Sequence, residues 1–208
     1  MLKRIITAII IISFILGAYF VYIDSIEKNR LKEDMNFIVS TLSNENEDWD
    51  IKEKALLALA DIGKPAIKPL IGLLNDKDYA LRRGAAFALG ELRHKSAVIP
   101  LAAVLNDGDK RVRYNAVMAL GKIGDKRSIG PLIVALKDES PSVRIEAARI
   151  LGEIGGKSAI ESLITLMKDE NWGVREEGYV ALKKITHQDL GWDYRKWLEW
   201  WQNQKKLQ

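Results

Sequence analysis

A 31-residue sequence repeat constrains the fold of this chain more than any other feature. The unit is clearest over residues 107–136, DGDKRVRYNAVMALGKIGDKRSIGPLIVAL, where two apolar helical patterns flank a short turn. Val112, Ala116 and Leu120 fall at helical spacings, so they lie on one face of a predicted helix. Neither helix can bury its apolar face alone, and the unit therefore needs neighbouring copies.

The copies keep one register along the chain. An arginine recurs every 31 residues, and an aspartate stands six residues before each of these arginines. The two sets comprise Arg82, Arg113, Arg144 and Arg175, with Asp76, Asp107, Asp138 and Asp169. An earlier apolar copy begins at Ile51, offset by 30 residues. Several copies at a fixed period predict a solenoid, in which each repeat packs on its sequence neighbours.

Apolar periodicity places a pair of helices in each copy. The predicted pairs are 49–62 with 65–75, 79–92 with 95–105, 110–123 with 126–137, 141–154 with 157–168, and 172–185 with 192–206. Glycine follows three of the first helices, at the position where a left-handed C-cap favours it. Arg93 takes that position in the second pair, so we expect a different turn there.

These residues resemble a known family. The pattern D-x-x-x-x-V-R-x-x-A-x-x-A-L-G-x-I-G, followed by a helix rich in Leu, Ile and Val, is similar to the short HEAT repeat of the phycobilisome-lyase type. It is best matched by Asp107, Val112, Arg113, Ala116, Ala119, Leu120, Gly121, Ile123 and Gly124. The resemblance covers residues 31–206 and implies an all-α fold, a right-handed α-solenoid of about five HEAT-like helix pairs. Ankyrin and tetratricopeptide repeats have nearby periods, but their sequence patterns are absent.

The start of the chain predicts a membrane anchor. Residues 1–4 are short and basic, and residues 5–23 contain no charge. At about 1.5 Å per residue, a helix over residues 5–23 spans roughly 28 Å, close to the hydrocarbon thickness of a bilayer. The positive-inside rule predicts a cytoplasmic N-terminus and an extracytoplasmic repeat domain. The alternative is a cleaved signal peptide, although apolar regions of signal peptides are usually shorter.

The two ends of the array are predicted to be capped. We expect residues 24–48 to form a linker and a capping half repeat, residues 49–186 to form the HEAT-like repeats, and residues 187–208 to form an aromatic capping helix. Terminal repeats need such covers because one of their faces has no neighbour. The C-terminal aromatic residues are alternatively a docking surface, since Trp and Tyr are enriched at binding hot spots. They are Tyr194, Trp197, Trp200 and Trp201.

Two sets of cations recur at the repeat period. The arginines are interpreted as structural, because each comes with an aspartate that cancels its charge locally. A row of anion-binding arginines is the alternative. The lysines stand at the starts of the second helices, where they could form a basic rim on the concave face for a partner, or simply be solvated. These lysines are Lys64, Lys95, Lys126 and Lys157.

Composition excludes several kinds of chemistry. The chain has no cysteine, which removes disulfides, thiol nucleophiles and cysteine-ligated metals. A net charge of +4 is too mild to indicate nucleic acid by itself. Gly156-Lys157-Ser158 lacks the earlier glycine of a phosphate-binding loop, because residue 151 is Leu. We find no catalytic constellation, and we expect no metal and no cofactor.

The sequence therefore favours a membrane-tethered HEAT-repeat scaffold that binds a protein or peptide on its concave face. Solenoids offer extended surfaces suited to this role. One alternative is an enzyme related to the phycobilin lyases, as the name of the repeat type suggests. Another is a solenoid that binds nucleic acid or anionic lipid, and nucleic acid is the less favoured of these ligands. The sequence does not indicate the partner or the oligomeric state.

Overall fold

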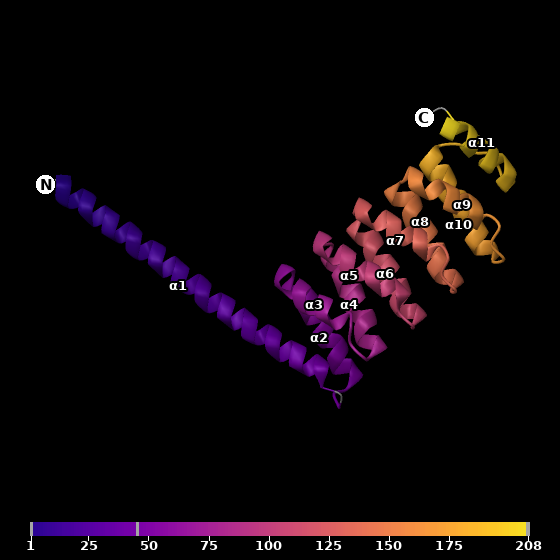
Figure 1. Cartoon of the computed structure of the whole chain (residues 1–208). Helices are drawn as coiled ribbons and strands as arrows, with labels where there is room; N and C mark the ends of the chain where they lie inside the picture. Colours follow the sequence, from indigo (N-terminus) through magenta and orange to yellow (C-terminus); the bar gives the residue numbers. More distant parts are fainter. Residues whose placement is uncertain (1, 45, 207–208) are drawn as a thin grey trace. The chain divides into compact units, whose positions relative to one another are not determined.

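The computed structural model describes the backbone of residues 2–44 and 46–206, and side chains within those ranges from residue 21 onward. The chain divides into two compact units, residues 1–55 and residues 56–208. Every regular element in the described ranges is a helix (Figure 1). The all-α class predicted from the repeat is therefore confirmed for this part of the chain.

One long helix makes up most of the first unit. Helix α1 (Leu2–Ser43) continues without a break from the predicted anchor into the predicted capping segment. Near its C-terminal end Leu42 is fully buried, whereas Phe37 is 72% exposed, so the side chains of this part are covered on one side only. Helix α2 (Trp49–Ile62) follows and contains the boundary between the two units.

The predicted membrane span, residues 5–23, lies almost entirely outside the residues whose side chains are described. Within the described residues, no helix combines the length and the apolar character needed to cross a bilayer. The anchor and its topology therefore stay predictions.

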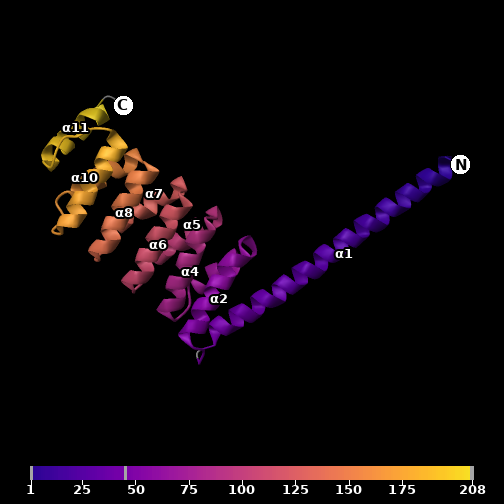
Figure 2. The same ribbon diagram turned by 180° about the vertical axis from the view of Figure 1, so that it is seen from behind.

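The second unit is built from helix pairs that follow one another in chain order (Figures 1 and 2). Its first helices pack on their counterparts in the next pair, α4 on α6, α6 on α8 and α8 on α10. These helices are α4 (Tyr79–Leu92), α6 (Lys110–Ile123), α8 (Pro141–Ile154) and α10 (Trp172–Thr186). The second helices are α3 (Ile67–Leu73), α5 (Val98–Ala103), α7 (Ile129–Ala135), α9 (Ile160–Leu166) and α11 (Tyr194–Lys206). This is the architecture of an α-solenoid.

The ends of the first helices follow from short local signals. The carboxylate of Asp78 accepts a hydrogen bond from the Ala80 backbone N–H at 2.9 Å, and so caps α4. Asp109 caps α6 in the same way, through the N–H of Arg111 at 2.8 Å. Such caps satisfy donors that have no partner within the helix. The observed bounds of α4, α6 and α8 coincide with those predicted.

Four of the second helices, α3, α5, α7 and α9, are shorter than predicted, since a turn of 3₁₀ helix takes up the start of each and each also ends two residues early. The four turns are η1 (Lys64–Ala66), η2 (Lys95–Ala97), η4 (Lys126–Ser128) and η5 (Lys157–Ala159). In each, a backbone N–H donates to the carbonyl three residues earlier, as Ala97 does to His94 at 3.0 Å. This tighter pattern is common at helix ends, and apolar periodicity does not distinguish it from α-helix.

The expectation of a different turn after α4 is confirmed in part. Arg93 adopts the left-handed conformation, with φ 49° and ψ 28°, close to the φ 65° and ψ 22° of Gly124 after α6. The hydrogen bonds differ, because the Arg93 N–H donates to the carbonyl three residues earlier and the Gly124 N–H to the carbonyl four residues earlier. The packing of successive repeats fixes the direction of this turn, so a non-glycine residue takes a disfavoured conformation there.

Two rows of buried leucines form the core of the second unit. Leu89, Leu120 and Leu151 on the first helices have no exposed surface, and each follows the previous one by 31 residues. The second helices contribute a matching row of fully buried leucines, Leu70, Leu101, Leu132 and Leu163. Each repeat thus buries its apolar faces against the preceding and following copies, as the periodicity requires.

Candidate functional site

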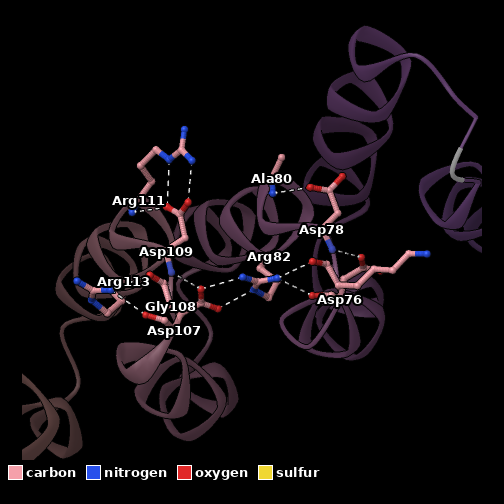
Figure 3. Close-up of polar contacts among 10 residues, drawn as sticks. Asp76, Asp78, Ala80, Arg82, Asp107, Gly108, Asp109, Arg111 and Arg113 are labelled. Atoms are coloured by element: carbon pink, nitrogen blue, oxygen red, sulfur yellow. Dashed lines mark hydrogen bonds and ion pairs between the residues drawn. The ribbon is translucent and has the colours of Figure 1, made fainter.

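The repeated arginines and aspartates are joined across successive repeats. Arg82 donates from Nε and Nη2 to the two carboxylate oxygens of Asp107, at 2.6 and 2.9 Å (Figure 3). Arg113 makes the same two-pronged contact with Asp138, at 2.7 and 2.9 Å. Two parallel N–H···O bonds fit the planar guanidinium and carboxylate groups well. We call these contacts the Arg–Asp ladder.

Each arginine of the ladder also supports the loop that precedes its own helix. Nη1 of Arg82 donates to the backbone carbonyl of Asp76 at 2.8 Å (Figure 3). Nη1 of Arg113 donates to the Asp107 carbonyl, also at 2.8 Å. The aspartate side chains order the same loops, since Oδ1 of Asp107 accepts from the Asp109 N–H at 2.9 Å. One guanidinium therefore ties two consecutive inter-repeat loops together.

The charges of the Arg–Asp ladder neutralise one another. The hydrogen bond between Arg82 and Asp107 lowers the pKa of the carboxyl and raises the pKa of the guanidinium, so both groups are charged at neutral pH. The side chains of Arg113 and Asp138 are 6% and 7% exposed. Buried and paired in this way, the arginines have little capacity for an external anion, which favours the structural interpretation over the anion-binding one.

The last rungs of the ladder are less complete. Arg144 reaches Asp169 through Nη2 alone, at 2.8 Å, and its buried Nε has no hydrogen-bond partner among the described residues. Arg175 donates to the backbone carbonyls of Asp169 and Glu170, at 2.8 and 2.9 Å. Position 200, one period after Asp169, is a tryptophan, so Arg175 has no aspartate in a following repeat.

The repeated lysines stand in the opposite situation. Each is the first residue of one of the 3₁₀ turns η1, η2, η4 and η5, and each is exposed. Within the described residues, none of their ammonium groups forms a hydrogen bond or an ion pair. We call Lys64, Lys95, Lys126 and Lys157 the lysine row.

Acidic residues beside the lysine row are already paired. Asp125 caps η4 and binds Arg127, whose Nη2 lies 2.8 Å from the carboxylate and 3.0 Å from the Lys95 carbonyl. The hydrogen bond from Arg127 lowers the pKa of Asp125 well below its usual range. Glu91, nearby in sequence, pairs with Lys122. Lys95 forms no ion pair with Asp125 but still contributes to its lowered pKa, so the charge of Lys95 is offset in part, while Glu91 is engaged by Lys122.

The C-terminal aromatic residues occupy graded environments. Trp197 is fully buried, and its indole N–H donates to the Gly191 carbonyl at 2.8 Å. Trp201 is 9% exposed, whereas the adjacent Trp200 is half-buried. Tyr194 lies under the ammonium of Lys168, 4.9 Å from its ring centre. The burial of Trp197 fits a capping role, and Trp200 keeps an accessible face.

Two aromatic residues outside the predicted set join this cluster. The ring centres of Tyr179 and Trp192 are 4.5 Å apart, and Tyr179 meets the edge of Trp197 at 6.4 Å. The hydroxyl of Tyr179 donates to Asp189 at 2.6 Å. The equivalent positions of the earlier repeats hold the small apolar residues Ala86, Val117 and Ala148, so the repeat pattern did not predict an aromatic residue at Tyr179.

A cavity of about 370 Å³ lies at the C-terminal end of the lysine row. Lys157 is part of its lining, with Trp200 and Trp201. His187, Gln188 and Gln204 add polar groups, and no carboxylate lines it. We call it the tryptophan cavity. The sequence did not reveal it, because it forms where α11 departs from the repeat register.

A second cavity, of about 590 Å³, has the opposite character. It lies between the loop after α7 and helix α9, and Arg144 and Lys137 line it. Four carboxylates also contribute to it, from Asp138, Glu161, Asp169 and Glu170. Glu161 is bound by Lys205 of α11 at 2.5 Å, and this hydrogen bond lowers its pKa. We call it the acidic cavity.

Comparison with known proteins agrees with this architecture. The family described as HEAT repeats matches residues 67–133 and 129–190, which together make up more than half of the chain. No curated protein resembles the chain closely enough in sequence to count as a match.

Several solved structures share the fold. The complex of CpcE and CpcF of phycocyanin lyase from a Nostoc species aligns with a TM-score of 0.61 and 24% identity, over 74% of this chain and 65% of that chain, just under two thirds. A designed armadillo repeat protein in complex with the peptide (KR)4 aligns with a TM-score of 0.55 and 23% identity, over 79% and 86% of the two chains. YibA from Escherichia coli aligns at 0.60 and 18%, over 75% and 63%. These identities support a shared fold alone.

Proposed function

This chain belongs to the HEAT-repeat family, and we propose that its repeats form a scaffold that binds an acidic protein or peptide partner along the lysine row. The proposal rests on a division between two sets of cations. The arginines of the Arg–Asp ladder are engaged inside the solenoid, whereas the lysines are exposed and, in the described part of the chain, form no ion pair.

The regular spacing of the lysines suits an extended partner with several anionic groups. A single exposed ion pair contributes little, about 0.2–1 kcal/mol. Four cations at the same position of successive repeats can each meet one anionic group of an extended partner, and their contributions accumulate. Such a surface raises the association rate more than it raises affinity, and its effect weakens as ionic strength increases.

A related fold is known to hold a peptide, since one of the similar structures is a designed armadillo repeat protein in complex with (KR)4. That likeness supports the use of stacked helical repeats as a peptide surface. The peptide in that complex is basic, whereas the lysine row of this chain calls for an acidic one. The likeness to phycocyanin lyase extends to the fold alone, so the lyase and nucleic-acid alternatives stay predictions.

The proposal includes a membrane tether. Residues 5–23 would anchor the chain, residues 1–4 would lie in the cytoplasm, and the repeats would lie outside it. The uncharged sequence of residues 5–23 and the basic residues before it support this topology. Protease added to intact spheroplasts should then cut the repeat domain. Protection until the membrane is permeabilised would contradict this topology.

A crosslinking pull-down from native membranes tests the scaffold function. The full chain is the bait, and its variant carries Lys95→Glu and Lys126→Glu. The matched control carries Lys110→Glu and Lys137→Glu, which change the same charge at two other exposed lysines. We expect one partner to be recovered with the wild type and the control, and to be lost with the lysine-row variant. Equal recovery with both variants would contradict the proposal.

A further inference from the structure

The tryptophan cavity is shaped for an apolar group that sits beside an anion. The rings of Trp200 and Trp201 are stacked, with centres 6.2 Å apart and planes at 29°, and Ile160 and Ile185 also line the space. Its volume of about 370 Å³ lies in the range of ligand pockets, about 300–1,000 Å³. The only cation with a permanent charge in its lining is Lys157.

Of the polar side chains that line this cavity, Thr186 is used by the fold, since its hydroxyl donates to the Leu182 carbonyl at 2.7 Å. In the residues that the structure covers, the side chains of His187, Gln188 and Gln204 make no hydrogen bond to the protein. His187 ends α10 as a left-handed C-cap with a φ of 57°, and its backbone N–H donates to the Lys183 carbonyl at 2.9 Å, so this wall of the cavity is a helix end like that at Arg93.

The lysine row and the tryptophan cavity are continuous, because Lys157 belongs to both. Neighbouring packed helices are about 8–10 Å apart, so successive lysines follow one another at about that spacing. A polyproline II helix has three residues per turn and rises about 3.1 Å per residue, which gives a repeat of about 9 Å. Every third side chain of such a peptide would therefore face the next lysine.

We propose that the partner segment is an acidic peptide in the polyproline II conformation, with a carboxylate at every third residue opposite the lysine row and a large apolar or aromatic side chain in the tryptophan cavity. This inference rests on the proposed function and specifies the chemistry of its partner. The carboxylate nearest the anchor meets Lys157, and the anchor packs on Trp200 and Trp201.

The acidic cavity contributes little to selectivity, because three of its four carboxylates are paired: Asp138 with Arg113, Asp169 with Arg144, and Glu161 with Lys205. The charge preference comes from the lysine row, which attracts an acidic peptide and repels a basic one. The sign of the preferred peptide charge is therefore a direct outcome of the test.

Fluorescence anisotropy with labelled synthetic peptides tests the inference. The full chain is held in nanodiscs of zwitterionic phosphatidylcholine, which add no net charge. The first probe has four glutamates separated by Pro-Pro pairs. Two further probes add a phenylalanine at one end or the other, because either chain direction is compatible with the row. Controls place the four glutamates at every second residue, or replace them with lysine.

We expect one phenylalanine probe to bind at least tenfold more tightly than the probe without an anchor. That gain should disappear in Trp200→Ala, which removes a wall, and in Gln204→Trp, which fills the cavity without removing a core residue. Circular dichroism establishes that both variants keep the wild-type helix content. Lys95→Glu with Lys126→Glu should weaken the binding of all the every-third-residue glutamate probes.

Three results would overturn the inference: an anchor that gives no gain, a gain that survives in Gln204→Trp, or tighter binding of the lysine probe. Equal binding of the every-second-residue probe would overturn the assigned conformation and with it the inference. If the native partner is still captured in a lysine-dependent way, the proposed function stands in each of these cases. Loss of that dependence would overturn both.

Discussion

Removal of Arg113 should destabilise the protein far more than removal of an exposed arginine that makes a similar bidentate pair. Arg113→Ala eliminates two bonds to Asp138, at 2.7 and 2.9 Å, and one to Glu139 at 2.8 Å. It also eliminates the bonds to the Asp107 and Gly108 carbonyls, at 2.8 and 3.3 Å. Asp138 would then be a buried carboxylate without its counter-ion, since its side chain is 7% exposed. Breaking a buried pair by removing one partner costs about 3–5 kcal/mol. For a chain of this size that lowers Tm by about 6–20 °C.

Urea unfolding followed by circular dichroism measures this change. The matched control is Arg195→Ala, because Arg195 binds Asp193 through two bonds of 3.0 Å but its side chain is 76% exposed. The control should stay close to the wild-type midpoint, since water replaces the lost contact. Equal midpoints for the two variants, or a loss below about 1 kcal/mol for Arg113→Ala, would refute the structural interpretation of the Arg–Asp ladder.

Further variants test other parts of the account. The pKa of Asp107 is lowered in the folded state, so its carboxylate stabilises the fold above its ordinary pKa and loses this contribution as the pH falls. When unfolding is measured at a series of pH values from 6 downward, the urea concentration at the midpoint should decrease once the pH is below about 4, and it should decrease less in Asp107→Asn. Arg93→Gly should raise stability by about 0.5–1 kcal/mol, since glycine accepts the positive φ, and an unchanged or lower Tm would contradict this. Gly90→Ala should cost about 1–3 kcal/mol of stability, because the added Cβ would lie 2.9 Å from a backbone carbon of α6. Gly130→Ala should instead stabilise by about 0.5–1 kcal/mol, because nothing lies within 4 Å of its added Cβ. Thermal melts in which Gly90→Ala is the more stable variant would contradict the close packing of α4 on α6.

The first helices α4, α6 and α8 could be predicted to the residue because several local signals agree. For α6, the apolar period, the capping Asp109 and the terminal Gly124 all indicate the same bounds. The same period located the buried leucines, since a residue that recurs on one face of every copy must contact the next copy. Repetition converts a weak local pattern into a strong one.

Features that depend on backbone detail escaped the sequence. The 3₁₀ turns that open the second helices differ from α-helix by one hydrogen-bond register, which side-chain periodicity does not record. Arg93 has the conformation expected of glycine because packing between repeats sets the turn. In both places, packing between repeats determines the backbone conformation and overrides the intrinsic conformational preference of the residue.

The candidate site was predictable only in part. The lysine row followed from the repeat, because its members share one position in each copy. The tryptophan cavity did not, since it depends on where α11 lies against α9 and on the turn at His187, both outside the repeat register. Aromatic spacing indicated a buried helix there but not the space beside Trp200.

Measurement of partner capture and stability on the same protein tests the central claim most directly. The variant is Lys95→Glu with Lys126→Glu, assayed in parallel for urea unfolding and for recovery of the crosslinked partner. We predict an unfolding midpoint near that of the wild type together with loss of the partner, because these lysines support binding and not the fold. Partner recovery that persists, or that is lost only as the protein unfolds, would contradict this account.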